Sequence, residues 1–189
     1  MATPRVLAFA ASNSLTSINR RLALHAGDVL HALFDCTIKV SSLDLNDFEM
    51  PIYSPERQEA NGIPQKARDF YSRIGASDGV IISFAEHNGS YSAAYKNIFD
   101  WCSRIDMKVY QNKPMLLLAT SPGSRGGENV LKTALESTPF FGGDVVASFK
   151  LGSFATHFSD QTNEIVSHEP LSELRASVHA FGSAILINS

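Results

Sequence analysis

The chain has 189 residues, of which 44% are hydrophobic and 19% charged, and its formal net charge is −3. A chain of this size and composition can bury its own core without disulfides or metal, so we expect residues 1–189 to form a single globular domain. The mildly acidic balance, with a pI near 6.0, disfavours a DNA or RNA partner, because affinity for a polyanion depends on clustered positive charge.

The first structured stretch is expected to be a strand, a polar loop and a helix in direct succession. Val6–Ala11 is apolar and has the length of a buried strand, and Ser12-Asn13-Ser14 follows it without a spacer. Ser17 stands at an N-cap position, and apolar residues then recur at helical spacing through Leu33. Backbone N–H groups and hydroxyls in front of a helix N-terminus favour a phosphate. The alternative is that these serines serve only the turn and the cap.

The next part of the chain is less regular. Thr37–Val40 alternates apolar and polar residues, which predicts a strand nearer a sheet edge. Asp44–Pro64, which contains Pro51, Pro55 and Gly62, reads as a long irregular passage, the kind of loop that is either functional or mobile. Tyr53 within it either flanks a site or is an exposed residue without a role. A proline start and helical spacing predict a helix from Pro64 to Gly75.

Two later strands are expected to be buried on both faces. Val80–Phe84 and Met115–Ala119 are nearly continuous apolar runs, as in a parallel sheet covered on both sides. The first is followed by the polar loop Glu86–Ser90 and by helical spacing from Tyr91 to Arg104. The second is followed by the glycine-rich loop Ser121–Gly127.

In the last third of the chain, predicted strands and helices continue to alternate. Helical spacing predicts a helix over Glu128–Ser137, and a fifth strand is expected over Val145–Lys150. A final helix is predicted from Leu171 to Leu186. Between that strand and that helix, His157 and Phe158 are candidates to fold over a site from a neighbouring region.

This alternation of strands and helices indicates a doubly wound α/β sheet with helices on both faces. Ligand sites in such sheets form outside the carboxyl ends of the strands, where the strand order reverses. Ser12–Ser17, Glu86–Ser90 and Ser121–Gly127 all follow strands at those ends, so we expect them to converge on one ligand crevice.

Several other classes of site lack their motifs. No serine lies in a G-x-S-x-G turn, and neither G-x-x-x-x-G-K-[ST] nor G-x-G-x-x-G occurs, which disfavours a hydrolase triad, a P-loop and a dinucleotide-binding Rossmann site. The histidines are scattered and neither Cys36 nor Cys102 has a C-x-x-C partner, so no metal site is expected. Unpaired cysteines favour a reducing compartment. With no apolar run of membrane-spanning length and no signal-peptide pattern, we expect a cytoplasmic protein with no membrane contact.

Together, the loops resemble those of the NADPH-dependent FMN reductase family, a flavodoxin-like group that includes quinone, azo-dye and chromate reductases. Ala11–Asn19 lines up with the family's G-S-x-R-x-x-S-x-N, Ala85–Ser90 with P-E-Y-N-G-S, and Ser121–Gly127 with S-P-G-x-x-G-G. Lys96–Trp101 in the helix after the second loop and Pro51–Tyr53, similar to a P-x-Y element, extend the match, which covers nearly all of the chain before residue 144.

The resemblance implies a three-layer flavodoxin-like sandwich with a five-stranded parallel sheet of order 2-1-3-4-5. It also implies an FMN-dependent oxidoreductase that takes electrons from NAD(P)H and passes them to a small acceptor such as a quinone, commonly as a homodimer or homotetramer. No catalytic side chain is expected, because the flavin carries the chemistry. The implied cofactor-binding residues are Ser12, Ser14, Ser17, Ile18, Asn19, Glu86, His87, Asn88, Gly89, Ser90, Ser121, Pro122, Gly123, Gly126 and Gly127.

Two departures from the family pattern affect this expectation. Ser14 stands where the family usually has an arginine on the FMN phosphate, with Ala11 in place of the first glycine; Arg20 or Arg21 either reaches back to compensate or is a solvated helix residue. His87 replaces a tyrosine at the flavin's edge. Glu86 is either a capping or solvated carboxylate or an acceptor contact. The alternative functions are a flavodoxin-like FMN electron carrier without NAD(P)H oxidase activity, and a family member that has lost FMN.

Overall fold

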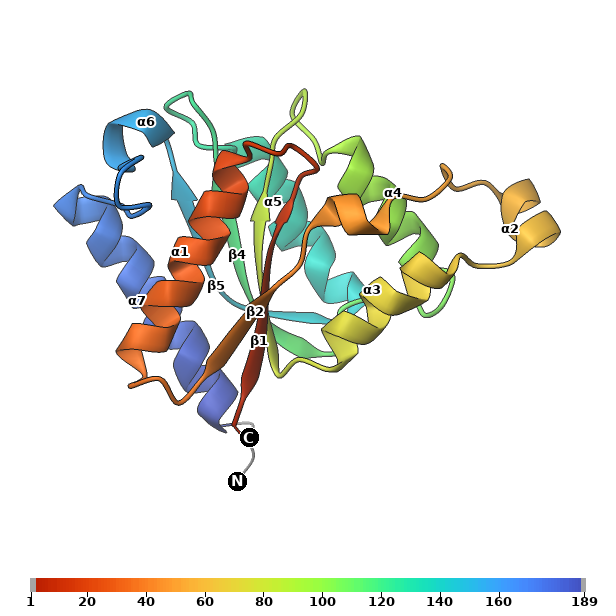
Figure 1. Cartoon of the computed structure of the whole chain (residues 1–189), viewed down its shortest axis with the longest axis horizontal. Helices are drawn as coiled ribbons and strands as arrows, with labels where there is room; N and C mark the ends of the chain where they lie inside the picture. Colours follow the sequence, from red (N-terminus) through yellow and green to blue (C-terminus); the bar gives the residue numbers. More distant parts are fainter. Residues whose placement is uncertain (1–2, 188–189) are drawn as a thin grey trace.

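The computed structural model describes residues 3–187 and contains one five-stranded parallel sheet of order β2-β1-β3-β4-β5, with helices on both faces (Figure 1). The strands are β1 (Arg5–Ala11), β2 (Lys39–Ser42), β3 (Gly79–Phe84), β4 (Lys113–Thr120) and β5 (Gly143–Leu151). The helices are α1 (Ile18–Leu33), α2 (Pro55–Asn61), α3 (Gln65–Gly75), α4 (Ala93–Cys102), α5 (Glu128–Ser137), α6 (Phe154–His157) and α7 (His168–Ile187), with 3-10 turns η1 (Leu45–Phe48) and η2 (Thr138–Phe141). The predicted fold class and strand order are confirmed.

The core lies in two apolar layers, one on each face of the sheet. Alternate residues of β1 point to opposite layers: Val6 and Ala8 pack with α1 and α7, whereas Leu7 and Phe9 pack with α3, α4 and α5. The central strands β3 and β4 are buried almost throughout because helices cover both of their faces, as their apolar sequences predict. None of the helices within residues 3–187 combines the length and the apolar character that a bilayer crossing requires.

Most predicted elements are confirmed, and the largest errors lie around β2. The strand expected over Thr37–Val40 runs two residues later, because Thr37 closes the turn after α1 by donating to the carbonyl of Phe34 (2.9 Å) while Lys39 pairs with Arg5 of β1. The passage 44–64, expected to be irregular, contains η1 and α2. Each begins at a side-chain cap, Asp44 for η1 and Ser54 for α2. Helix α2 buries no residue and projects from the body of the protein (Figure 1).

Candidate functional site

The loops that follow β1, β3 and β4 lie together at the carboxyl edge of the sheet, at the top of Figure 1. We refer to residues 12–17, 86–90 and 121–127 as the first, second and third loops. Hydrogen bonds between distant residues hold the three in place. Ser92 Oγ, at the N-cap of α4, donates to the carbonyl of Ala11 at the end of β1 (2.8 Å), which joins the end of the second loop to the start of the first.

The first loop presents hydroxyls and amides ahead of α1. Ser17 is the N-cap, as predicted, and its Oγ accepts the N–H of Arg20 (3.2 Å). Ser12 Oγ accepts the N–H of Ser14 (3.2 Å), and the carbonyl of Ser14 accepts the N–H of Ser17 (3.2 Å). Ser12 and Ser17 are buried, whereas Ser14 is exposed. Because both buried hydroxyls use only their acceptor capacity in these bonds, each keeps an O–H to donate to an anion.

Asn19 is buried and bonds within the protein. Its Nδ2 donates to the carbonyl of Thr120 (3.1 Å), and its Oδ1 accepts both the N–H of Thr120 (3.0 Å) and the hydroxyl of Ser83 (2.8 Å). This side chain therefore ties the first turn of α1 to the ends of β3 and β4. Ile18, the first residue of α1, is half-buried and packs against the apolar layer of α1 and α7.

The second loop is a tight turn whose tip faces solvent. His87 and Ser90 exchange two backbone hydrogen bonds, of 2.9 and 3.1 Å. Between them, Asn88 and Gly89 both have positive φ, 52° and 79°, which is the geometry of a type I′ turn and explains the Asn-Gly sequence. The N–H groups of these two residues lie outside the turn's own hydrogen bonds, and all four residues are exposed. The turn therefore leaves the N–H groups of Asn88 and Gly89 without a partner inside the turn.

Glu86 caps α5, which follows the third loop. One carboxylate oxygen accepts the N–H groups of Asn129 (2.9 Å) and Val130 (3.1 Å), and the other lies 3.3 Å from Asn129 Nδ2. The residue at the N-cap position is Gly127, which has no side chain to perform this role. Of the two alternatives for Glu86, the structure shows the cap, so the N-terminus of α5 already holds a carboxylate.

The third loop is braced by the backbone that follows β5. The carbonyls of Ser121 and Gly123 accept N–H groups from Phe154 (3.2 Å) and Ser153 (2.9 Å). Gly126 has φ +63°, and a Cβ there would lie 2.8 Å from the backbone N of Gly152. Only glycine fits such a close approach of two chains. Gly127 also has positive φ, while Pro122 is exposed beside Gly123.

His157 and Phe158 do not fold over the site, so that expectation was wrong. Phe158 is buried against α1, where it stacks on Phe154 (centroids 4.5 Å apart) and meets the ring of His25 edge-on. His157 Nδ1 lies 2.8 Å from Ser167 Oγ. The aromatic character of this segment anchors it to α1 instead.

Arg21 holds the same segment from α1. Its guanidinium donates to Asp160 Oδ1 (2.6 Å), Asn163 Oδ1 (3.1 Å) and the carbonyl of Ser159 (3.2 Å). The guanidinium carbon also lies over the ring of Phe158, 4.8 Å from its centroid. The Arg21 side chain therefore binds this segment, and Arg21 is not a solvated helix residue.

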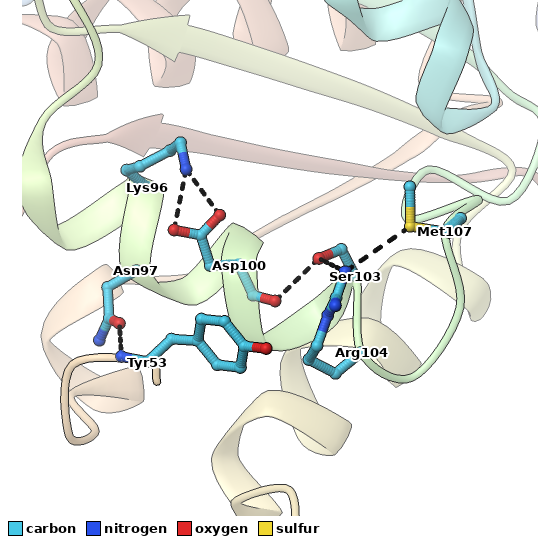
Figure 2. Close-up of polar contacts among 7 residues, drawn as sticks. All are labelled: Tyr53, Lys96, Asn97, Asp100, Ser103, Arg104 and Met107. Atoms are coloured by element: carbon cyan, nitrogen blue, oxygen red, sulfur yellow. Dashed lines mark hydrogen bonds and ion pairs between the residues drawn. The ribbon is translucent and has the colours of Figure 1, made fainter. Parts of the chain in front are cut away.

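The P-x-Y element is fixed to α4 and borders a cavity beside the first loop. Tyr53 N–H donates to Asn97 Oδ1 (2.9 Å), as Figure 2 shows, and the Tyr53 ring packs edge-on against Trp101. Trp101 Nε1 and Asn97 Nδ2 both donate to the carbonyl of Pro51. The residues lining the cavity, of about 250 Å³, include Asn13, Met50, Ile52 and Asn97. Tyr53 is not among the residues that line this cavity, and it supports the segment that does.

Sequence reasoning missed three groups that build this site. Ser83, Ser92 and Thr120 connect the strand ends to the loops. Ser92 carried a local signal, because it precedes the helical apolar pattern of α4 as an N-cap residue does. Ser83 and Thr120 carried none, since their partner Asn19 is 64 and 101 residues away.

The chain is similar to known reductases. A family model described as NADPH-dependent FMN reductase matches residues 4–157. A quinone reductase of Escherichia coli (strain K12) is 28% identical over 139 residues, which cover 72% of this chain and 74% of that protein. A 2-hydroxy-1,4-benzoquinone reductase of Burkholderia sp is 33% identical over 112 residues, or 58% and 56% of the two chains.

Solved structures show the same fold. The flavoenzyme FerB of Paracoccus denitrificans, an NAD(P)H:(acceptor) oxidoreductase, superposes with a TM-score of 0.74 at 23% identity, covering 97% of this chain and 98% of that one. A flavodoxin from Pseudomonas aeruginosa has a TM-score of 0.55 at 14% identity, covering 96% and 99%. With the family match over most of its length, the chain belongs to the NADPH-dependent FMN reductase family of oxidoreductases.

Proposed function

We propose that the three loops bind FMN and that the protein uses it to pass electrons from NAD(P)H to a small acceptor such as a quinone. The observation that carries this proposal is the convergence of the loops at the carboxyl edge of the sheet, in a chain that belongs to the NADPH-dependent FMN reductase family. The named quinone reductases among its relatives support a quinone as the acceptor class.

The first loop suits the phosphate end of FMN. Ser12, Ser14 and Ser17 offer hydroxyls, and the amide of Ile18 belongs to the first turn of α1, whose N-terminus favours an anion. Asn19 has its amide bonded to Thr120 and Ser83, so in this proposal it positions the loop instead of touching the phosphate.

The second and third loops suit the ring. The outward amides of Asn88 and Gly89, held by His87 and Ser90, are placed to bond the polar edge of an isoalloxazine, and Glu86 fixes that turn relative to α5. The third-loop residues proposed to border the ring are Ser121, Pro122, Gly123, Gly126 and Gly127.

When bound, FMN would accept hydride from a nicotinamide and reduce the acceptor. The protein's own contribution is to hold the ring edge and phosphate in fixed positions and to leave the exposed tip of the second loop accessible. The proposal includes no side-chain nucleophile.

Absorbance spectroscopy tests this function directly. The purified protein is reconstituted with FMN and mixed anaerobically with NADPH and then with NADH. A flavin spectrum that bleaches, and returns on adding a benzoquinone, supports the proposal. A flavin spectrum that neither nucleotide bleaches would indicate an electron carrier, and failure to take up FMN would indicate a chain that has lost the cofactor.

We also propose that the protein acts in the cytoplasm as a homodimer or homotetramer. An aromatic groove of about 340 Å³ between α4 and the α5–η2 segment supports self-association, because exposed Met107 lines it and Phe140, next to the lining residue Phe141, is also exposed. Figure 2 shows the charges that border it on α4 and in the turn that follows: Lys96 Nζ contacts both oxygens of Asp100, and Arg104 lies near Ser103 and Met107. Sedimentation velocity on the wild-type protein and on Phe140→Asp tests the assembly.

The proposed cytoplasmic location is supported by Cys36, a free and exposed cysteine, which suits a reducing compartment.

A further inference from the structure

Arg20 lies beside the first loop with most of its donors unused. It is the third residue of α1, and its side chain lines an open groove together with Leu15, Thr16 and Ser17. Helical side chains lean toward the N-terminus of their helix, hence toward this loop. The ion pair that the structure gives Arg20 is with Asp44, at 3.8 Å, which is beyond hydrogen-bond length, and the Arg20 side chain is 47% exposed.

The neighbouring Arg21 offers a direct contrast. Its guanidinium makes three hydrogen bonds to residues 159–163 and lies over two aromatic rings. Turning it toward the first loop would break all of these contacts. Of these two adjacent arginines, Arg20 is therefore the one able to move to a new partner.

The N-terminus of α1, like that of α4, has no acidic residue in its first turn, which distinguishes both from α5. The first turn of α1 contains no acidic residue, whereas α5 has Glu128 in its first turn and Glu86 bonded to its N–H groups. An anion entering the crevice thus meets repulsion at α5 and attraction at α1. Arg20 adds a full positive charge to the attractive end.

Asp44 forms an ion pair with Arg20 but makes no hydrogen bond to its guanidinium. The Asp44 carboxylate accepts the N–H and the side-chain amide of Asn46 through Oδ1 (2.9 and 2.8 Å), as the N-cap of η1, and these bonds lower the pKa of that carboxyl, mainly through the backbone N–H. Its other oxygen faces Arg20. Asp44 is therefore a fixed anion at the end of β2 that keeps the guanidinium close to the first loop.

We propose that Arg20 leaves Asp44 to bind the phosphate of FMN and is the residue by which this protein distinguishes FMN from riboflavin. This assignment rests on the proposed function. A guanidinium forms paired charge-assisted hydrogen bonds with phosphate oxygens, which are shorter and stronger than the present long ion pair. Riboflavin lacks the phosphate and would gain nothing from Arg20.

Flavin fluorescence quenching tests the assignment without measuring activity. The cofactor-free protein is titrated with FMN and with riboflavin, for the wild type, Arg20→Gln, Arg20→Lys and Arg21→Gln as the matched control. We expect Arg20→Gln to raise the Kd for FMN by about tenfold or more and to leave the Kd for riboflavin within about twofold. Arg20→Lys should recover part of the loss, because it restores charge without the planar fork.

Substitutions of the two neighbouring arginines should affect flavin binding in different ways. Arg21→Gln should leave the ratio of the FMN and riboflavin Kd values unchanged, whether or not it weakens both. Asp44→Asn, which keeps an oxygen for the η1 cap, should tighten FMN alone. Equal losses for both flavins in Arg20→Gln, or an unchanged Kd for FMN, would overturn the role of Arg20. If the wild type binds neither flavin, the proposed function itself fails and the assignment fails with it.

Discussion

Asn19 and Thr120, which are 101 residues apart in sequence, exchange two hydrogen bonds in the interior of the protein. The amide of Asn19 thereby joins the start of α1 to the end of β4, and its oxygen also accepts from Ser83. One side chain thus sets the relative position of the first and third loops. The phosphate end and the ring end of the proposed flavin site depend on this contact.

Replacing Asn19 with alanine should destabilise the fold strongly. The change leaves the N–H and carbonyl of Thr120 and the hydroxyl of Ser83 without this partner, and each buried unsatisfied group costs about 1–3 kcal/mol. We expect a loss of about 3 kcal/mol in the free energy of unfolding, measured by urea titration. Ser83→Ala is the matched control, because it removes a single donor, and it should cost about 1 kcal/mol. Equal effects of the two changes would contradict the central role of Asn19.

The third loop gives a prediction about two glycines three residues apart. Gly126→Ala should destabilise by more than about 1 kcal/mol, because the residue has positive φ and its Cβ would meet the backbone of Leu151 and Gly152. Gly123→Ala should be tolerated, since the nearest atom to its Cβ would be Ser121 Oγ at 3.9 Å. Thermal unfolding of the two variants provides the comparison. Similar melting temperatures would mean that the loop relaxes away from the β5–α6 connection.

The features that could be predicted from the sequence are those that a local pattern of residues indicates, such as helix caps and buried strands. Ser17 was identified as a cap because it precedes a helical apolar pattern, and the central strands were identified because they are apolar on both faces. Asp44 and Ser54 carried similar capping signals, but the surrounding prolines favoured an irregular loop.

The links between the loops could not be predicted from local pattern. Glu86 bonds Asn129 across 43 residues, and Asn19 bonds Thr120 across 101. These partners are mainly backbone groups, which almost every residue possesses, so nothing in the sequence identifies them. The position of the three loops after parallel strands predicted that they would meet at one edge of the sheet, whereas the hydrogen bonds that hold them there required the fold.

Glu86→Ala should weaken the start of α5 and loosen the second loop. It removes the acceptor for two helix N–H groups and a negative charge near the helix N-terminus, together worth about 1–2 kcal/mol. Glu86→Gln keeps one acceptor oxygen and should lose less, about 0.5–1 kcal/mol. Chemical unfolding measures the two losses. If glutamine were as damaging as alanine, the charge rather than the hydrogen bonds would account for the cap.

His25 should make the protein less stable in mild acid. Its Nε2 lies 3.3 Å from the N–H of Ile165, and burial lowers its pKa, although Glu164 and Asp28 oppose the shift. The folded protein therefore binds a proton at lower pH than the unfolded chain. The stability from this group is complete above the unfolded pKa of about 6.5 and is lost as the pH falls toward the lower folded value.

Urea titrations between pH 7.5 and 5 should show this loss in the wild type. His25→Leu should be less stable at pH 7.5, because the N–H of Ile165 loses its acceptor, yet its stability should fall less between the two pH values. The other histidines are present in both proteins, so the difference in slope isolates His25. Parallel slopes would contradict the assignment.

Arg21 should control how firmly the third loop is braced. Arg21→Gln removes the hydrogen bonds to residues 159–163 and the contacts with Phe154 and Phe158. Because Asp160 is 88% exposed, solvent reduces the value of this ion pair, and we expect the segment to lose about 1–2 kcal/mol of local stability. Amide exchange at Ser153 and Phe154, whose N–H groups hold the third loop, should then accelerate roughly 5- to 30-fold. Arg20→Gln should leave these two amides unchanged, since the ion pair of Arg20 is with Asp44, so equal acceleration in both variants would show that the brace does not depend on Arg21.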